Sequence, residues 1–134
     1  MQQRYQSFLV SVLLMLLVSI GLSAAQTDEA DNLRIAFVSN RDGNENIYVM
    51  ATDGSNQVSL TMHEGRDWNP TWSPDGSEIL FNSDRDGRET LYVMNFDGTN
   101  IRPLFAGETS NEYDGAWSPD GNRLAYTVFP VTAT

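Results

Sequence analysis

The sequence predicts an all-β fold built from repeated, tightly turned antiparallel sheets, and three observations predict it. A nine-residue run, Ile35–Gly43, recurs 44 residues later as Ile79–Gly87. The run Trp72–Gly76, which reads Trp-Ser-Pro-Asp-Gly, recurs 45 residues later at Trp117–Gly121. The segments between these motifs are short, apolar and rich in β-branched and aromatic residues, and no helical period is found after residue 33. A repeat of this length indicates one small sheet per unit.

Tight turns are predicted at fixed places in each unit. Ser-Pro-Asp-Gly places Pro74 at the turn position that requires a φ of about −65°, with Gly76 two residues on. The Arg-Asp-Gly runs and the later Asp53-Gly54 and Asp97-Gly98 pairs are typical of hairpins, because glycine accepts the positive φ that these turns need. Four short strands per unit follow from this spacing.

The predicted strands are apolar on both faces. Alternate residues of a strand point to opposite sides, and in Ile35–Val38 and Ile47–Met50 both sets are apolar. A sheet with one wet face would alternate polar and apolar residues instead. Each sheet is therefore expected to lie between two neighbours, as the blades of a β-propeller do. A β-solenoid is the second interpretation, and a two-sheet sandwich is the third because it leaves the repeat unexplained.

The motif run resembles the TolB-type β-propeller repeat, which is similar to WD repeats in architecture, and the resemblance covers residue 35 to about residue 128. It is carried by Trp72–Gly76, Ile79–Phe81, Ser83–Gly87, Leu91–Met94, Asp97-Gly98 and their counterparts. In TolB the propeller is periplasmic, works in the Tol-Pal envelope system and contacts the peptidoglycan-associated lipoprotein, and the resemblance implies for this chain the fold and the role of a binding scaffold. TolB carries an α/β domain ahead of its propeller, whereas the first strand here follows closely on the expected signal. The same repeats occur in propellers of prolyl-oligopeptidase-like peptidases.

Residues 1–25 have the pattern of a secretory signal peptide. Arg4 precedes a helical apolar stretch over residues 8–22, and the small residues Ser23, Ala24 and Ala25 suit cleavage before Gln26. The apolar stretch is shorter than the roughly 20 residues that span a bilayer, so no stable membrane span is expected after cleavage. We expect a linker over 26–33, partial TolB-like propeller repeats over 34–129 and a tail over 130–134, in an exported periplasmic or extracellular protein. An uncleaved anchor is the alternative.

The motif positions predict about two and a half blades in an incomplete ring. Three strands of a first blade precede one whole blade over residues 68–105, and two strands of a third blade follow it. A closed propeller needs at least about four blades. The open interpretations are a truncated chain, a protomer that completes its ring by self-association, and an open stack.

Composition excludes several function classes. The net charge is −10, from 18 acidic and 8 basic residues, which argues against nucleic acid because phosphate binding needs a basic surface. No cysteine is present, so neither disulfides nor thiolate metal sites are expected. A calcium site is not expected at the turn over residues 42–46, because the equivalent turn has Arg88 in the place of Asn44. No cofactor is predicted.

An enzyme is not predicted. His63 is the single histidine, and no Gly-x-Ser-x-Gly motif for a nucleophile is present. The expected function is a binding or interaction module that contacts an envelope or extracellular protein. The alternative is the propeller portion of a larger prolyl-oligopeptidase-like hydrolase whose catalytic domain lies outside this sequence.

Binding is expected at the loops that join one blade to the next, because repeats diverge there. There are two such loops, over residues 62–68 and 107–113. Each carries an acid and then an aromatic residue ahead of the inner strand, which is the first strand of the next blade. The predicted binding residues of these rim loops are His63, Arg66, Asp67, Trp68, Glu112, Tyr113 and Asp114. The repeat motif residues are expected to be structural: Trp72, Ser73, Pro74, Asp75, Gly76, Trp117, Ser118, Pro119, Asp120, Gly121, Arg41, Asp42, Gly43, Arg85, Asp86 and Gly87.

Overall fold

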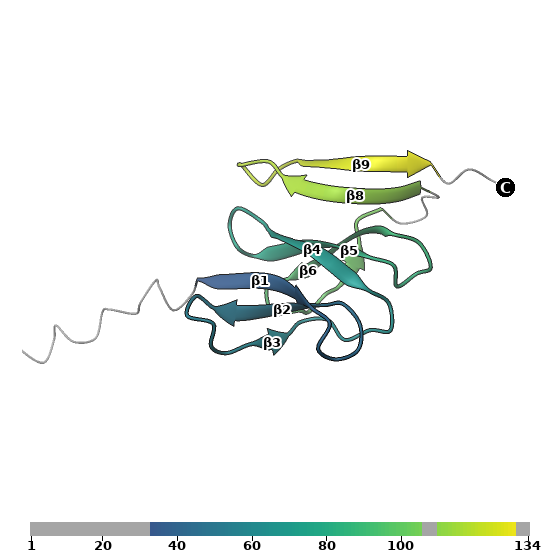
Figure 1. Cartoon of the computed structure of the whole chain (residues 1–134). Helices are drawn as coiled ribbons and strands as arrows, with labels where there is room; N and C mark the ends of the chain where they lie inside the picture. Colours follow the sequence, from purple (N-terminus) through teal and green to yellow (C-terminus); the bar gives the residue numbers. More distant parts are fainter. Residues whose placement is uncertain (1–32, 106–109, 131–134) are drawn as a thin grey trace, which may run out of the picture. The chain divides into compact units, whose positions relative to one another are not determined.

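A computed structural model describes residues 33–105 and 110–130 of the chain (Figure 1). These residues form nine strands, every pairing between them is antiparallel, and no helix occurs among them. The strands all belong to the unit formed by residues 34–134. The prediction of an all-β fold is confirmed. The signal peptide predicted for residues 1–25 lies outside the described residues, as do most of the linker and of the tail.

The strands form three separate sheets of three, four and two strands, drawn in Figure 1 as successive layers. The first sheet has the order β1 (Arg34–Ser39), β2 (Asn46–Ala51), β3 (Val58–Ser59). The second has the order β4 (Asp67–Trp72), β5 (Glu78–Ser83), β6 (Thr90–Asn95), β7 (Arg102–Pro103). The third pairs β8 (Ser110–Trp117) with β9 (Leu124–Pro130). This is the expected arrangement of one whole blade between two partial ones.

The hairpins form where the turn residues predicted them. Gly43 lies in the turn between β1 and β2, and Gly87 lies in the turn between β5 and β6, with φ values of +109° and +82°, which only glycine adopts readily. The outermost strands β3 and β7 are two residues long, and β7 contains Pro103, which cannot donate to a further strand. The edges formed by β3 and β7 are therefore short, which limits pairing with other chains at these two edges.

The main core lies between the first and second sheets. Ile47 and Val49 of β2 share one buried cluster with Ile79 and Phe81 of β5, and Tyr92 of β6 joins them. The strand β5 is buried on both faces, since the exposed fraction is 0–1% from residue 79 to residue 81. Each such side chain contributes about 2–3 kcal/mol through burial of its apolar surface. The two-sided burial predicted for the strands is confirmed for β2, β5 and β6, whereas Ile35 of β1 is 41% exposed.

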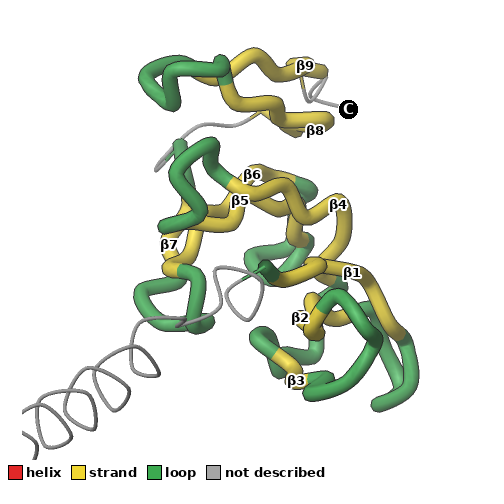
Figure 2. The backbone as a smooth tube through the Cα atoms, turned by 90° about the vertical axis from the view of Figure 1, so that its left-hand side faces the viewer, coloured by secondary structure: helices red, strands yellow, loops and turns green. Residues whose placement is uncertain are grey.

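Main-chain hydrogen bonds connect each sheet to the next. The amide of Asp67 donates to the carbonyl of Glu45 (2.8 Å), and the amide of Glu112 donates to the carbonyl of Glu89 (3.0 Å). The inner strand of one sheet, which is β4 or β8, packs on the long strands of the sheet before it, as the tube in Figure 2 shows. Because the sheets are held this way, the beginnings of β4 and β8 lie next to the hairpins that contain Glu45 and Glu89 in the preceding sheets.

Candidate functional site

The predicted rim loops end at the first residues of β4 and β8, and the acid in each of these positions is buried. Asp67 is 0% exposed, and both of its carboxylate oxygens accept hydrogen bonds from Nη2 of Arg85, at 2.8 and 2.9 Å. The guanidinium of Arg85 also lies over the rings of Phe81 and Tyr92, at 5.4 and 4.9 Å from their centroids. The Asp67 carboxylate is therefore fully used in fixing the hairpin of its own sheet to the inner strand.

Glu112, which takes the place of Asp67 in the third sheet, is equally buried. Its carboxylate accepts hydrogen bonds from the hydroxyls of Thr90 and Ser110, the latter at 2.6 Å, and its exposed fraction is 1%. The nearest arginine is Arg88, with Nη1 3.9 Å from Oε1, but Arg88 donates its good hydrogen bond (2.7 Å) to the backbone carbonyl of Ser110. Glu112 thus fixes β8 to β6 of the second sheet.

The accessible part of the rim is a hydrogen-bonded network across two sheets. Arg66 donates to Asp84 (2.9 Å) and to Oε1 of Glu89 (3.2 Å), while the Tyr113 hydroxyl donates to Oε2 of the same Glu89. The Arg66 guanidinium lies 5.0 Å from the centroid of the Trp68 ring. We call Arg66, Trp68, Glu89, Tyr113 and Asp114 the rim surface. Arg66 and Tyr113, which the sequence placed in separate loops, are brought together here by Glu89.

The charges of the rim surface shift the pKa values of its members. The hydrogen bond to Glu89, followed by burial, raises the pKa of the Tyr113 phenol, so this group stays a neutral donor. Partial burial opposes ionisation of Asp84, but the hydrogen bonds from Arg66 outweigh it and lower the pKa of that carboxyl. The side chain of Arg66 is still 51% exposed, so its remaining donors can reach a partner. The network is therefore ordered and ionic, which suits binding.

Asp114 lies at a bulge of β8 that repeats a bulge of β4. The register shifts between Trp68 and Thr71 and again between Tyr113 and Ala116, and the exposed residues Asn69 and Asp114 have φ values of 52° and 54°. Asparagine and aspartate tolerate this left-handed conformation better than other non-glycine residues. A depression of about 310 Å³ lies between the two bulges and is lined by Asn69, Pro70, Thr71, Asp114 and Gly115.

His63 is exposed and orders its own loop. Its Nδ1 accepts a hydrogen bond from the amide of Gly65 (2.9 Å), and its carbonyl accepts one from the side-chain amide of Asn44 (2.6 Å). Asn44 donates a second bond to the Gly65 carbonyl (2.8 Å), so this residue of the acidic turn acts as a donor rather than as a cation ligand. No group of three or more metal-ligating side chains occurs in residues 33–105 and 110–130.

Sequence reasoning missed Glu89, which is the centre of the network. The repeat carried a signal for it, because Glu89 occupies the place of Glu45 in the first unit, and the backbone carbonyls of both receive the next sheet. Both residues were interpreted only as acidic residues of a turn, so the role of the Glu89 side chain was not predicted. Asp84 and Asn69 were missed for the same reason, since their repeat positions were treated as parts of loops.

Several residues of the repeat motif bond or pack within the sheets. Tyr48 donates its hydroxyl to Asp42, and Tyr92 does the same to Asp86, so each of these acids ties its hairpin to the next strand. Trp72 packs against the main core. The indole Nε1 atoms of Trp72 and Trp117 are buried and have no hydrogen-bond partner among the described residues.

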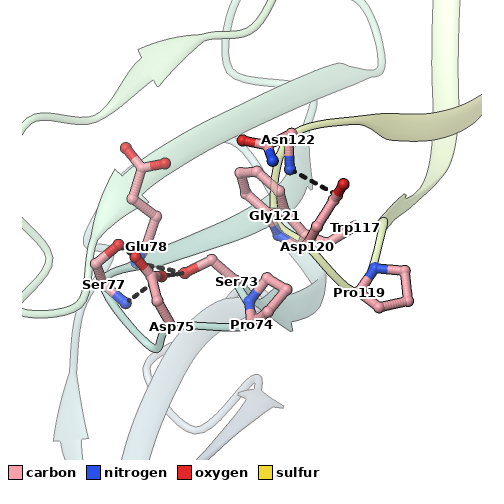
Figure 3. A pocket seen from close by; sticks show the side chains of 10 residues that line it. All are labelled: Ser73, Pro74, Asp75, Ser77, Glu78, Trp117, Pro119, Asp120, Gly121 and Asn122. Carbon is pink, nitrogen blue, oxygen red and sulfur yellow. Dashed lines mark hydrogen bonds between the residues drawn. The ribbon is translucent and has the colours of Figure 1, made fainter.

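A second hollow, of about 400 Å³, lies at the opposite end of the inner strands, between the two Ser-Pro-Asp-Gly turns (Figure 3). The turns face each other across it, with the Trp117 side chain between them. Their polar groups are occupied within each turn: Asp75 accepts from the hydroxyl of Ser73 (2.6 Å) and from the amide and hydroxyl of Ser77. Asp120 accepts from the amide of Asn122 in the same way.

The family is decided by a match to a known domain that covers all the described residues. The description of that domain is TolB beta propeller domain, and the match runs over residues 20–130. The chain belongs to the TolB β-propeller domain family. The Tol-Pal system protein TolB of Anaeromyxobacter dehalogenans strain 2CP-C is 41% identical over 95 residues, which cover 71% of this chain and 21% of that protein. The protein of the same name from Geobacter sulfurreducens is 41% identical over 58 residues, covering 43% of this chain and 13% of that protein.

Solved TolB structures have the same fold. The structure of a TolB from Agrobacterium tumefaciens matches with a TM-score of 0.68 and 28% identity, over 75% of this chain and 36% of that one. TolB from Acinetobacter baumannii matches with a TM-score of 0.64 and 28% identity, over 75% of this chain and 25% of that one. The chain spans about a fifth of the length of the Anaeromyxobacter relatives that it matches. No helix in the described parts of the chain is long and apolar enough to cross a membrane.

Proposed function

We propose that this chain is an exported β-propeller module that binds an envelope or extracellular protein through the rim surface. One observation carries the proposal: Glu89 joins Arg66 of one sheet to Tyr113 of the next, so side chains from two blades form one ordered surface. Because the groups are already held in place, a partner would meet little ordering cost on binding. The signal-like pattern of residues 1–25 supports export.

The composition of the rim surface fits recognition of a protein. Tryptophan, tyrosine and arginine are the residues most often found at the energetic centre of protein interfaces. Here Arg66 lies over Trp68, and Tyr113 lies edge-on to Phe129 with centroids 5.6 Å apart. The exposed Asp114 adds a negative charge that would favour a partner with basic side chains. We expect Trp68 and Tyr113 to supply contact area and the charged residues to set orientation.

The relatives suggest which partner to test first. They are named as proteins of the Tol-Pal system, and the TolB resemblance implies contact with the peptidoglycan-associated lipoprotein. We propose that lipoprotein as the first candidate partner of the rim surface. The alternative, a propeller belonging to a prolyl-oligopeptidase-like hydrolase, has no observation in its favour among the described residues, where Nδ1 of His63 accepts a bond from its own loop.

The test is the affinity for the periplasmic domain of the peptidoglycan-associated lipoprotein from the same cell. Trp68→Ala together with Asp114→Ala removes the aromatic contact and the exposed Asp114 charge without touching the buried Asp67–Arg85 pair. It also removes the 3.4 Å bond that Asp114 accepts from the side chain of Asn69. We expect the dissociation constant, measured by biolayer interferometry, to rise by about tenfold or more, as loss of interface centres does. Asp67→Ala is avoided because it would unpair a buried arginine.

Phe96→Ala is the matched control, because Phe96 is 49% exposed and lies on a turn away from the rim surface. Its affinity should equal that of the original chain, and the far-ultraviolet circular dichroism of all variants should be the same. If the rim variant binds as tightly as the control, the rim surface is not the binding site.

A further inference from the structure

The complete blade contains an arginine–carboxylate pair, and each partial blade has only one of the two residues. In the second sheet, Arg85 follows the strand β5 and pairs with Asp67 at the start of the inner strand β4. The first sheet keeps the arginine, Arg41, but its described residues include no inner strand beside β1. The third sheet keeps the acid, Glu112, but the repeat position of Arg85 is occupied there by Pro130.

Arg41 has the same aromatic surroundings as Arg85 but no carboxylate partner among the described residues. It lies over the rings of Phe37 and Tyr48, at 5.6 and 4.6 Å, just as Arg85 lies over Phe81 and Tyr92. Its guanidinium donates to the hydroxyl of Ser39 (2.8 Å) and to Oε1 of Gln57 (2.7 Å). It forms no ion pair with any carboxylate in residues 33–105 and 110–130.

The edge of β1 next to Arg41 is also incompletely covered. Ile35 is 41% exposed, whereas Ile79, its counterpart in the complete sheet, is 0% exposed and lies opposite Trp72 of the inner strand. The edge of β1 therefore has both the hydrogen-bonding groups and the apolar side chains that an inner strand would cover.

The strand β9 pairs with β8 along its length, but its apolar side chains are only partly covered. In the second sheet, Ile79 and Phe81 of β5 join the core with β2, but their counterparts Leu124 and Tyr126 of β9 line an open groove of about 400 Å³. The groove continues over Leu104 and Phe105 of the second sheet. Tyr126 lies against the ring of Phe105 in this groove, with centroids 4.6 Å apart, and is still 40% exposed. Val128 and Phe129 of β9 are 47% and 57% exposed.

We propose that the chain self-associates head to tail, with β1, β2 and β3 of a second copy pairing with β8 and displacing β9. The repeat fixes the register of this pairing. Asp67 lies opposite Ser83 in the complete sheet, so Glu112 would lie opposite Ser39 of the second copy, and Ala116 opposite its Ala36. Arg41 of the second copy then reaches Glu112 as Arg85 reaches Asp67, and its Ile35 and Phe37 fill the groove that Leu124 and Tyr126 leave open.

The exchange has a definite outcome for assembly. It replaces a two-stranded sheet by a four-stranded one, so each copy contributes two complete blades to the assembly. The contact is heterologous, because one copy offers β8 and the other offers β1, and such contacts close into rings when the rotation allows. Propellers close with about four to eight blades, so two to four copies would complete a ring.

Cysteine cross-linking distinguishes this pairing from its alternatives, since the natural chain has no cysteine. The full chain is prepared as single variants Ala36→Cys and Ala116→Cys, which are mixed and oxidised. Cross-strand partners lie within disulfide reach, so we expect a linked heterodimer on a non-reducing gel. The control mixture uses Ala36→Cys with Ala125→Cys, because Ala125 is the exposed β9 residue opposite Ala116. The control should link roughly tenfold more slowly or not at all.

A second variant tests whether β9 must leave. Ala116→Cys with Ala125→Cys in one chain locks β9 onto β8, so light scattering should find monomers when it is oxidised and multimers when it is reduced. Arg41→Gln should weaken association by roughly a hundredfold, as expected when one partner of a buried ion pair is removed. The exposed Arg34→Gln on the same strand should leave association unchanged.

The expected result is a natural chain that forms multimers of two to four copies at micromolar concentration. Equal linking in the two mixtures would overturn the proposed pairing. A natural chain that stays monomeric while showing the circular dichroism of a β protein would overturn it as well. Neither result depends on the partner proposed for the rim surface, because these measurements contain only this chain.

Discussion

The carboxylate of Asp67 is 0% exposed, and one arginine, Arg85, forms an ion pair with it. Breaking a buried ion pair on one side is much more costly than never having made it, because the remaining charge stays desolvated. The Arg85 side chain is 13% exposed, so it cannot recover full hydration without moving. The stability of the second blade therefore depends on this pair more than on any exposed one.

Asp67→Asn should lower the free energy of unfolding by about 3 kcal/mol, because Arg85 loses its charged partner while still buried. Urea unfolding followed by circular dichroism measures this change. Glu64→Gln is the matched control on an exposed loop, and it should change stability by less than about 0.5 kcal/mol. A loss below about 1 kcal/mol for Asp67→Asn would mean that solvent reaches the pair.

The Ser-Pro-Asp-Gly turns make stability depend on acid pH. Hydrogen bonds from the Ser73 hydroxyl and from Ser77 hold the pKa of Asp75 at about 2, below its ordinary value of 3.8. Because the folded pKa is the lower one, the contribution is complete above about pH 4 and is lost as the pH falls towards 2. The Ser118 hydroxyl lowers the pKa of Asp120 in the same direction.

Asp75→Asn should therefore remove part of the acid dependence. We expect the midpoint of urea unfolding to fall less steeply between pH 4 and pH 2 in this variant than in the original chain. At pH 7 the variant should be the less stable of the two, because the amide accepts the turn hydrogen bonds less well than the carboxylate. Identical pH profiles would show that the turn does not hold Asp75 ionised.

Some of these residue roles could be predicted from the sequence and others could not. The packing of Trp72 and the turn geometry of Pro74 follow from their fixed place in the repeat. The burial of Asp67 did not follow, because its partner Arg85 is 18 residues away and the pair exists only once two strands align. An acid beside an aromatic residue looks the same in a sequence whether it faces a partner or an internal arginine.

At the scale of the elements, the strands with apolar residues on both faces were the easiest to predict. The bulges of β4 and β8 were missed because the residues with positive φ are Asn69 and Asp114, not glycine. These bulges turn the chain between the rim surface and the packed half of each inner strand. The short strands β3 and β7 carry little pattern of their own, and their pairing is set by the hairpin before them.

The inner strand β8 should be sensitive to the size of one residue. A Cβ at Gly115 would lie 2.5 Å from Cδ2 of Leu80 and 3.1 Å from Cδ2 of Leu91, so Gly115→Ala should lower the free energy of unfolding by about 1–3 kcal/mol through overpacking. Leu80→Ala in the same chain gives the double-mutant cycle. A coupling of about 0.5 kcal/mol or more, seen as relief of the overpacking, would confirm the contact, and strict additivity would contradict it.

At the scale of the whole molecule, stacking of the sheets followed from their two-sided burial, and the number of strands in each sheet followed from the motif spacing. The network of Arg66, Glu89 and Tyr113 could not be predicted, because it depends on the distance and angle between neighbouring sheets. No repeat pattern contains that geometry. The functional surface of a propeller therefore has to be read from the stacked structure even where every blade is recognisable in the sequence.

The bond from each inner-strand amide to a carbonyl of the preceding sheet uses backbone atoms alone. Any residue except proline can supply such a donor, whatever its side chain. A newly duplicated unit in the gene would thus dock onto its predecessor at once, before any substitution had adapted the two. Adding a unit would therefore preserve this backbone bond at each new junction and leave the side chains there free to differ.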